Sequence, residues 1–142
     1  MKIIFLGTRS YPIDEETVSI LVDKGKTKIL LDCCPSIIRQ LHKVGYDPAQ
    51  INHVFLSHIH LDHVLGFPLL LWGNFLVRLS SVRSMGAQAD FLNIYATRNV
   101  FSEVSSIMEA TAPVMSALSK RIKITHFHIS HKNELSISGE CK

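Results

Sequence analysis

The segment His58-Ile59-His60-Leu61-Asp62-His63 constrains the fold of this 142-residue chain more than any other feature. It comes directly after Val54-Phe55-Leu56, a short apolar run that is typical of a buried strand. Imidazole and carboxylate groups are ligands that zinc and similar ions take from proteins. Ligands of α/β folds bind at the carboxyl ends of strands. The sequence therefore predicts a strand that ends at a metal site, at one edge of a sheet.

The spacing within this segment favours two metal positions over one. In an extended segment His58 and His60 project to the same side and can share one ion. Asp62 and His63 come at the start of the following helix and turn toward a second position. These four residues do not complete the coordination of either ion, so further ligands must come from elsewhere. The alternative is a set of surface histidines or a capping cluster, which suits a lone histidine better than a group of four ligand-type residues.

Apolar patterning predicts an α/β domain with a mixed sheet. The second and third expected strands are joined by Asp23-Lys24-Gly25-Lys26, which favours an antiparallel hairpin. Hairpin strands followed by alternating strands and helices are typical of this class. The expected strands are Met1–Leu6, Thr17–Val22, Thr27–Leu31, Ile51–Ser57, Phe91–Ala96 and Ile122–Ile129.

Caps and helical spacing place the expected helices. Ser36 is expected to cap a short helix that turns Ile37, Ile38 and Leu41 inward and stops at Gly45. Thr97 is expected to cap a helix over Asn99–Met108. The remaining expectations are a turn of helix at Asp47–Gln50, a buried helix pair between Val64 and Leu79, and a loop over Ser80–Asp90.

Composition excludes a disordered chain and a membrane protein. Hydrophobic residues make up 46% of the sequence, enough to build a core. The longest apolar stretch, Val64–Leu79, is interrupted by glycine, proline and arginine, so it does not meet the requirement for a spanning helix. The N-terminal apolar run is too short for a signal peptide, which predicts a cytoplasmic protein. Three cysteines, Cys33, Cys34 and Cys141, give no disulfide framework and suggest reduced thiols.

The histidine-rich segment resembles the HxHxDH signature of the metallo-β-lactamase-fold hydrolases. The likeness extends along the chain and is closest to the ribonuclease Z-like group. The segments that carry it, besides His58–His63, are Phe5-Leu6-Gly7-Thr8, Leu30-Leu31-Asp32, Gly66-Phe67-Pro68 and Leu92-Asn93-Ile94-Tyr95.

This resemblance implies an αββα sandwich, of which residues 1–142 form the N-terminal part of a single domain. It implies two zinc ions in the complete site, with His58, His60, Asp62 and His63 as ligands. Asp62 would also orient the attacking water and act as general base. Asp32 is expected to hold the backbone of the metal loop through hydrogen bonds. Half a sandwich leaves one face of its sheet uncovered, which explains the mean hydropathy of +0.20.

The sequence also departs from the family pattern. Transfer-RNA 3′-processing nucleases of the group carry a Gly-Glu turn where this chain has Cys34-Pro35-Ser36, which weighs against strict tRNA processing. The family site needs a histidine, a bridging aspartate and a last histidine from further along the chain. The later histidines here are His126, His128 and His131, none of which is expected to be a ligand.

The predicted function is a binuclear-metal hydrolase, first of a phosphodiester in RNA or a smaller molecule. Its mechanism would use a water whose pKa the metals lower. A second interpretation keeps the metals and changes the substrate to a thioester, lactone or other ester, because one fold hosts many reactions. A third is a catalytically incomplete metal-binding fragment. The expected partners are the substrate and a second copy of the chain in a homodimer, with no membrane.

Overall fold

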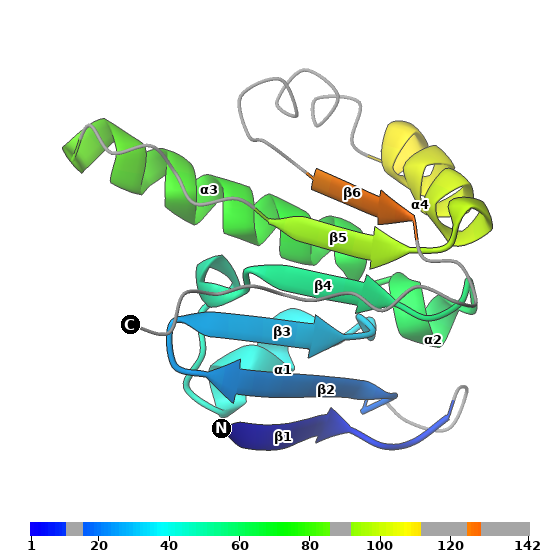
Figure 1. The fold of residues 1–142 in the computed structure, drawn as a ribbon, viewed down its shortest axis with the longest axis horizontal. Coiled ribbons are helices and arrows are strands. Elements are labelled where there is room, and N and C mark those ends of the chain that lie inside the picture. Colours follow the sequence, from blue (N-terminus) through cyan, green and yellow to red (C-terminus); the bar gives the residue numbers. More distant parts are fainter. Residues whose placement is uncertain (11–15, 86–91, 112–124, 129–142) are drawn as a thin grey trace.

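The computed structural model describes residues 1–10, 16–85, 92–111 and 125–128 (Figure 1). Six strands form one sheet, and their order in space follows their order in the chain. The strands are β1 (Lys2–Gly7), β2 (Ser19–Lys24), β3 (Thr27–Leu31), β4 (His53–Leu56), β5 (Asn93–Ala96) and β6 (Thr125–His128). The helices are α1 (Ile37–Lys43), the short 3₁₀ helix η1 (Pro48–Gln50), α2 (Leu61–Val64), α3 (Phe67–Met85) and α4 (Arg98–Thr111).

The pairing of the strands confirms the expected mixed sheet. β1, β2 and β3 pair antiparallel, and β3, β4, β5 and β6 pair parallel. The turn between β2 and β3 forms because Gly25 adopts a φ of 76° and donates its N–H to Asp23 Oδ1 at 2.7 Å. Each parallel connection runs through at least one helix, as parallel strands require.

One face of the sheet carries the hydrophobic core. Leu21, Leu30, Val54 and Ile94 are successive cross-strand partners from β2 to β5, and all are buried. Helices α1 and α3 lie behind this sheet in Figure 1. Removing these apolar side chains from water is the main driving force for the fold. The helical residues that join them in the core are Ile37, Leu41, Val64, Phe67, Leu70, Leu71, Val100 and Val104.

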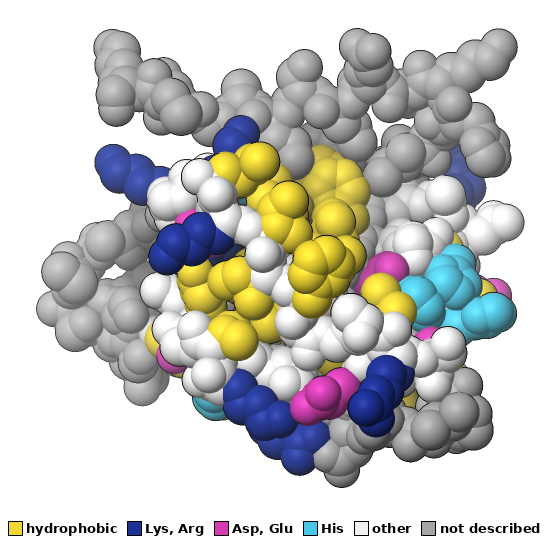
Figure 2. Space-filling view, turned by 90° about the horizontal axis from the view of Figure 1, so that it is seen from below, with side chains coloured by type: hydrophobic (Ala, Val, Ile, Leu, Met, Phe, Trp, Pro, Cys, Tyr) yellow, Lys and Arg dark blue, Asp and Glu magenta, His cyan; other side chains and the backbone are white. Residues whose placement is uncertain are grey.

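The opposite face of the sheet carries a second apolar row. Phe5, Ile20, Leu31, Phe55 and Tyr95 are successive partners from β1 to β5. The rings of Phe55 and Tyr95 stack at 4.2 Å, whereas Phe5 is 64% exposed. Figure 2 looks onto the β1 edge and shows hydrophobic side chains gathered there, with histidines projecting at one end. The row is not uniformly exposed, because Leu31 is 36% exposed and Tyr95 only 4%.

Two expectations about local structure are wrong. Ser36 precedes α1 but its side chain makes no capping hydrogen bond, because its backbone is not extended and its Oγ lies 3.6 Å from Cys34 Sγ. The segment 80–85 is not a loop but the last part of α3. No glycine or proline interrupts it, and serine and arginine are tolerated within helices. Residues 86–91 lie outside the described ranges.

The helix pair after the histidine segment is only half buried. Gly66 separates α2 from α3, and Pro68 stands in the first turn of α3, where its missing N–H costs nothing. Leu70 and Leu71 are buried, but Leu69 is 56% exposed and Leu76 45% exposed on the outward side of the helix. None of the helices in the described part of the chain has the length and apolar character needed to cross a membrane.

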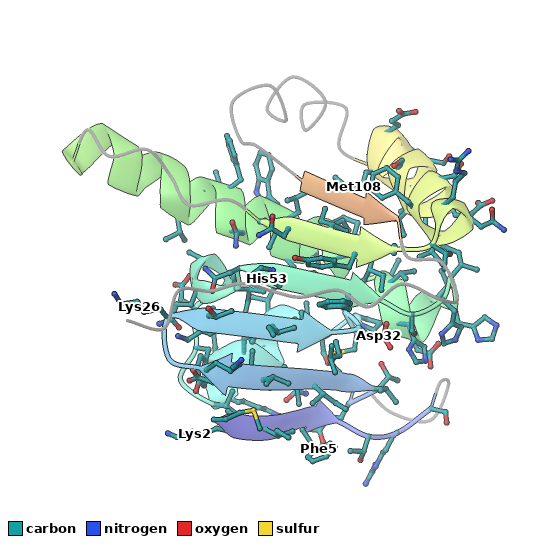
Figure 3. The ribbon with its side chains drawn as sticks, in the orientation of Figure 1. Lys2, Phe5, Lys26, Asp32, His53 and Met108 are labelled. Carbon is teal, nitrogen blue, oxygen red and sulfur yellow. The ribbon has the colours of Figure 1, made fainter. Side chains whose placement is uncertain are left out.

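We expect the stability of the fold to depend on pH through His53. Burial lowers the pKa of His53, on β4, below its ordinary value of 6.5, and its Nδ1 lies 2.9 Å from Tyr95 Oη (Figure 3 labels His53). Its contribution is therefore complete above pH 6.5 and is lost as the pH falls through the lowered folded-state pKa. Urea midpoints at about pH 7 and about pH 5 should differ less in His53→Gln than in the parent chain.

The matched control for this measurement is His42→Gln, which changes an exposed histidine on α1. It should leave the pH dependence unchanged. Equal pH dependence in His53→Gln and His42→Gln would contradict the role given to His53.

We expect the exposed members of this apolar row, Phe5 and Leu31, to drive association of the chain. Phe5→Thr keeps a residue with good β propensity and removes the most exposed ring of the row. Sedimentation velocity over a range of concentrations should show less association for Phe5→Thr than for the parent. Val44→Thr, which changes an apolar residue 39% exposed at the end of α1, is the control. A parent chain that stays monomeric throughout would rule out this role of the row.

Candidate metal centre

The histidine segment lies where the sequence predicts it, between a strand and a helix. β4 ends at Leu56, and α2 begins at Leu61 with His60 as its N-cap in an extended conformation. Asp62 and His63 therefore stand in the first turn of α2. Asp62 is 9% exposed, while His60 is exposed to solvent. All these side chains are at the carboxyl end of β4, next to the carboxyl end of β3.

Three imidazole rings lie against one another at this edge. The centroid of the His58 ring is 4.5 Å from that of His60 and 4.0 Å from that of His63. The His58 ring thus lies near both other rings, rather than near His60 alone. Asp62 is beside them, with its Oδ2 3.6 Å from His63 Nε2. The predicted division into a His58–His60 position and an Asp62–His63 position stays a prediction.

Asp32 connects the histidine segment to the sheet. It follows β3 directly, with a φ of 59°, and lies at the carboxyl end of that strand (Figure 3). Its Oδ1 accepts a hydrogen bond from Ser57 N, and its Oδ2 accepts one from Ser57 Oγ, each at 2.8 Å. The same Oδ2 lies 2.8 Å from His63 Nδ1. One carboxylate therefore contacts both ends of the histidine segment.

The chemistry of these donors fits a metal ion. Because His63 Nδ1 faces the Asp32 carboxylate, a neutral ring carries its proton there and its lone pair on Nε2. That lone pair faces Asp62 Oδ2 across 3.6 Å. Two acceptors this close repel each other unless a proton or a metal ion lies between them, and imidazole with carboxylate is a donor set that zinc accepts. In the part of the chain that is described, however, no three His, Cys, Asp or Glu side chains are arranged as a group ready to hold an ion.

The backbone of the short helix α2 is held by other elements. Gly66 N, which would continue the helical pattern to Asp62 O, donates instead to Cys33 O at 3.0 Å. Asp62 O accepts a hydrogen bond from Thr17 Oγ1 at 3.2 Å, and Thr17 is 1% exposed. His63 O accepts from Cys33 N at 2.7 Å. A Cβ on Gly66 would lie 1.9 Å from Cys34 O, so only glycine permits this close approach.

A second buried hydroxyl group holds the chain around Asp32. Ser19 Oγ donates to Asp32 O at 3.2 Å and accepts from Cys34 N at 2.9 Å. Ser19 is fully buried. Sequence reasoning placed Thr17 and Ser19 only as strand residues, and Ser57 only as the residue before the histidines. The one available signal was their polar character at the end of otherwise apolar strands.

The two described cysteines are not arranged as nucleophiles. Cys33 and Cys34 are both fully buried and make no disulfide. Burial raises the pKa of the Cys33 thiol well above 9.0, and the charges of Cys34 and Asp32 add to this effect. A thiol so rarely ionised is a poor nucleophile. Cys141 lies outside the described residues.

No described contact joins the remaining histidines to the histidine segment. His42 is an exposed residue of α1, and His53 bonds Tyr95 at the opposite end of β4. The backbone of His126 and His128 lies in β6, two strands from β4, and His128 ends β6 at the same carboxyl edge, paired with Ala96, which pairs with Leu56. His131 lies outside the described residues.

Comparison with solved structures identifies the fold. The chain matches the crystal structure of human tRNase Z, short form, with a TM-score of 0.65 and 23% identity, covering 90% of this chain and 44% of that one. It matches the metallo-β-lactamase fold protein YhfI of Bacillus subtilis with a TM-score of 0.62 and 18% identity, covering 94% and 48%. The chain has the metallo-β-lactamase fold, and its described sheet and helices form part of it.

The family assignment comes from the N-terminal part of the sequence. Residues 1–82 match the family model described as Anti-Pycsar protein Apyc1. The chain belongs to this family.

Among curated relatives, the chain is similar to proteins named Ribonuclease Z. It is 41% identical to that of Methanocaldococcus jannaschii over 73 residues, which is 50% of this chain and 23% of the relative. It is 30% identical to that of Methanococcus aeolicus over 141 residues, which is 96% of this chain and 39% of the relative. The chain is thus ribonuclease Z-like, and it spans well under half the length of these relatives.

We expect removal of the Thr17 hydroxyl to destabilise the chain. Thr17→Val keeps the shape of the side chain but leaves Asp62 O without this buried donor, at a cost of about 1–3 kcal/mol in the free energy of unfolding. Urea denaturation measures this loss. Thr17→Ser, which keeps the hydroxyl, is the matched control and should lose less. A valine variant as stable as the serine variant would show that the hydrogen bond contributes nothing.

Proposed function

We propose that this chain carries part of the active site of a zinc-dependent, ribonuclease Z-like hydrolase. In this proposal His58 and His60 bind one of two zinc ions, and Asp62 and His63 bind the other. The observation that supports it is the arrangement of Asp32, His63 and Asp62, which leaves an imidazole lone pair facing a carboxylate oxygen. The similarity to proteins named Ribonuclease Z supports a phosphodiester substrate, in RNA or a smaller molecule.

The residues of this chain have distinct parts in the proposed reaction. Zinc, when bound, would lower the pKa of a coordinated water and neutralise charge at the attacked phosphorus. Asp62, at the start of α2, would orient the attacking water and accept its proton. Asp32 holds the segment in place through Ser57 and His63. Residues 1–142 are taken as the N-terminal part of one domain, and a homodimer and a cytoplasmic location stay predictions.

The test begins with metal binding. The chain, refolded with zinc and freed of excess ion, should retain zinc when analysed by mass spectrometry. Asp62→Asn should retain less. His42→Gln, whose ring is exposed on α1 away from the segment, should retain as much as the parent. A chain that keeps its circular dichroism spectrum but binds no zinc would defeat the proposed site.

The second measurement separates the candidate reactions. Hydrolysis of bis(p-nitrophenyl) phosphate supports the phosphodiesterase, and its rate should fall about 100-fold or more in Asp62→Asn. Hydrolysis of p-nitrophenyl acetate or of a thioester, without cleavage of the phosphodiester, would support the ester hydrolase instead. Zinc binding with neither activity would support the metal-binding fragment.

A further inference from the structure

The Ser57 hydroxyl group connects His58, the first histidine of the segment, to the Asp32 carboxylate. The same carboxylate contacts His63, the last histidine. Ser57 Oγ lies 2.8 Å from Asp32 Oδ2 and 2.9 Å from His58 Nδ1. The same Asp32 Oδ2 lies 2.8 Å from His63 Nδ1. The contacts therefore form one chain of polar atoms, from His58 through Ser57 and Asp32 to His63.

The number of protons available along this series of polar atoms fixes the tautomer of both imidazole rings. A carboxylate only accepts hydrogen bonds, so the single hydroxyl proton of Ser57 must point to Asp32. Ser57 Oγ then has only lone pairs to offer His58, and a hydrogen bond between them requires the proton to be on His58 Nδ1. His63 must likewise carry its proton on Nδ1, toward Asp32. In the neutral rings both lone pairs are then on Nε2.

We propose that Ser57 is a positioning residue that fixes His58 in the tautomer whose Nε2 is free to bind metal. The expected effect of Ser57 on zinc affinity rests on the proposed function. The tautomer of His58 does not, because it is a property of the metal-free protein. Groups that accept the second N–H of a ligating histidine fix its tautomer and ring orientation. Here the Asp32 carboxylate orients the His63 ring directly and the His58 ring through the Ser57 hydroxyl group.

Ser57 is exposed, so water competes for its hydroxyl. The backbone nevertheless restricts the side chain, because Ser57 N donates to Asp32 Oδ1 at 2.8 Å. Asp32 is 8% exposed and is held in turn by Ser19. The hydroxyl is therefore presented to His58 from a fixed point. We expect its effect on zinc affinity to be about tenfold, at the lower end of the range for such partners.

The first experiment reads the tautomer directly. Long-range proton–nitrogen NMR spectra of the metal-free chain, at a pH where the ring is neutral, should show His58 with its proton on Nδ1. Ser57→Ala should convert His58 to a mixture or to the other tautomer, and Ser57→Thr should restore the parent pattern. Ser106→Ala, which removes an exposed hydroxyl from α4, should change nothing. A proton on Nε2 in the parent, or an unchanged tautomer in Ser57→Ala, would overturn the inference.

The second experiment measures zinc affinity by competition with a chromogenic chelator. Ser57→Ala should bind zinc about tenfold more weakly, with Ser57→Thr and Ser106→Ala close to the parent. Equal affinity in all four proteins would overturn the part of the inference that concerns metal. If the parent bound no zinc, the proposed function would fail, and the NMR result would still decide the role of Ser57.

Discussion

The hydrogen bonds of the Asp32 carboxylate are the interaction on which the candidate site depends. A carboxylate that is 8% exposed is costly to bury unless hydrogen-bond donors surround it. Here the donors come from the segment that it holds, at Ser57 and His63. The strand end, the connecting segment and the first turn of α2 therefore share one polar centre. Loss of any of these donors leaves part of a buried charge unpaired, so the group is stable only as a whole.

The backbone at Asp32 is also unusual. Asp32 has a φ of 59°, a conformation that few residues other than glycine adopt and that aspartate tolerates better than most. It is kept there by Asp32 N, which donates to Phe55 O at 2.8 Å, and by Ser19, which contacts Asp32 O. Strain of this kind persists only where the surroundings fix it, and it gathers at functional sites. The strained residue and the histidine segment occupy the same edge of the sheet.

Much of the fold was predictable because it depends on local patterns. Each strand from β2 to β5 places a buried apolar residue on the core face, namely Leu21, Leu30, Val54 and Ile94, and these residues belong to the apolar runs that the sequence shows. The hairpin needed only the turn at Gly25. The segment 80–85 was misassigned because serine and arginine do not distinguish a helix from a loop. The histidines were visible for a different reason, since four ligand-type residues in so short a segment are rare.

The residues that hold the site could not be predicted, because their partners are distant in sequence. Thr17 contacts a residue 45 positions away, Ser57 one 25 positions away, and Ser19 one 13 positions away. A serine or threonine at a strand end looks the same whether it faces water or a buried carbonyl. Asp32 was found only through a family resemblance. Its partnership with Ser57 depends on the register of β3 beside β4, which no local pattern specifies.

The order of the strands has a consequence for how the chain assembles. Because the spatial order follows the order in the chain, every strand after the first docks onto one that has already been synthesised. Only the β2–β3 hairpin closes a short loop; the parallel pairs Ile29–His53, His53–Asn93 and Asn93–Thr125 join residues 24, 40 and 32 positions apart, and such non-local pairing is slow. The partners of the histidine segment, from Thr17 to Gly66, are all present once residue 66 has left the ribosome. The framework of the site can therefore form during translation, with the N-terminal part folding first.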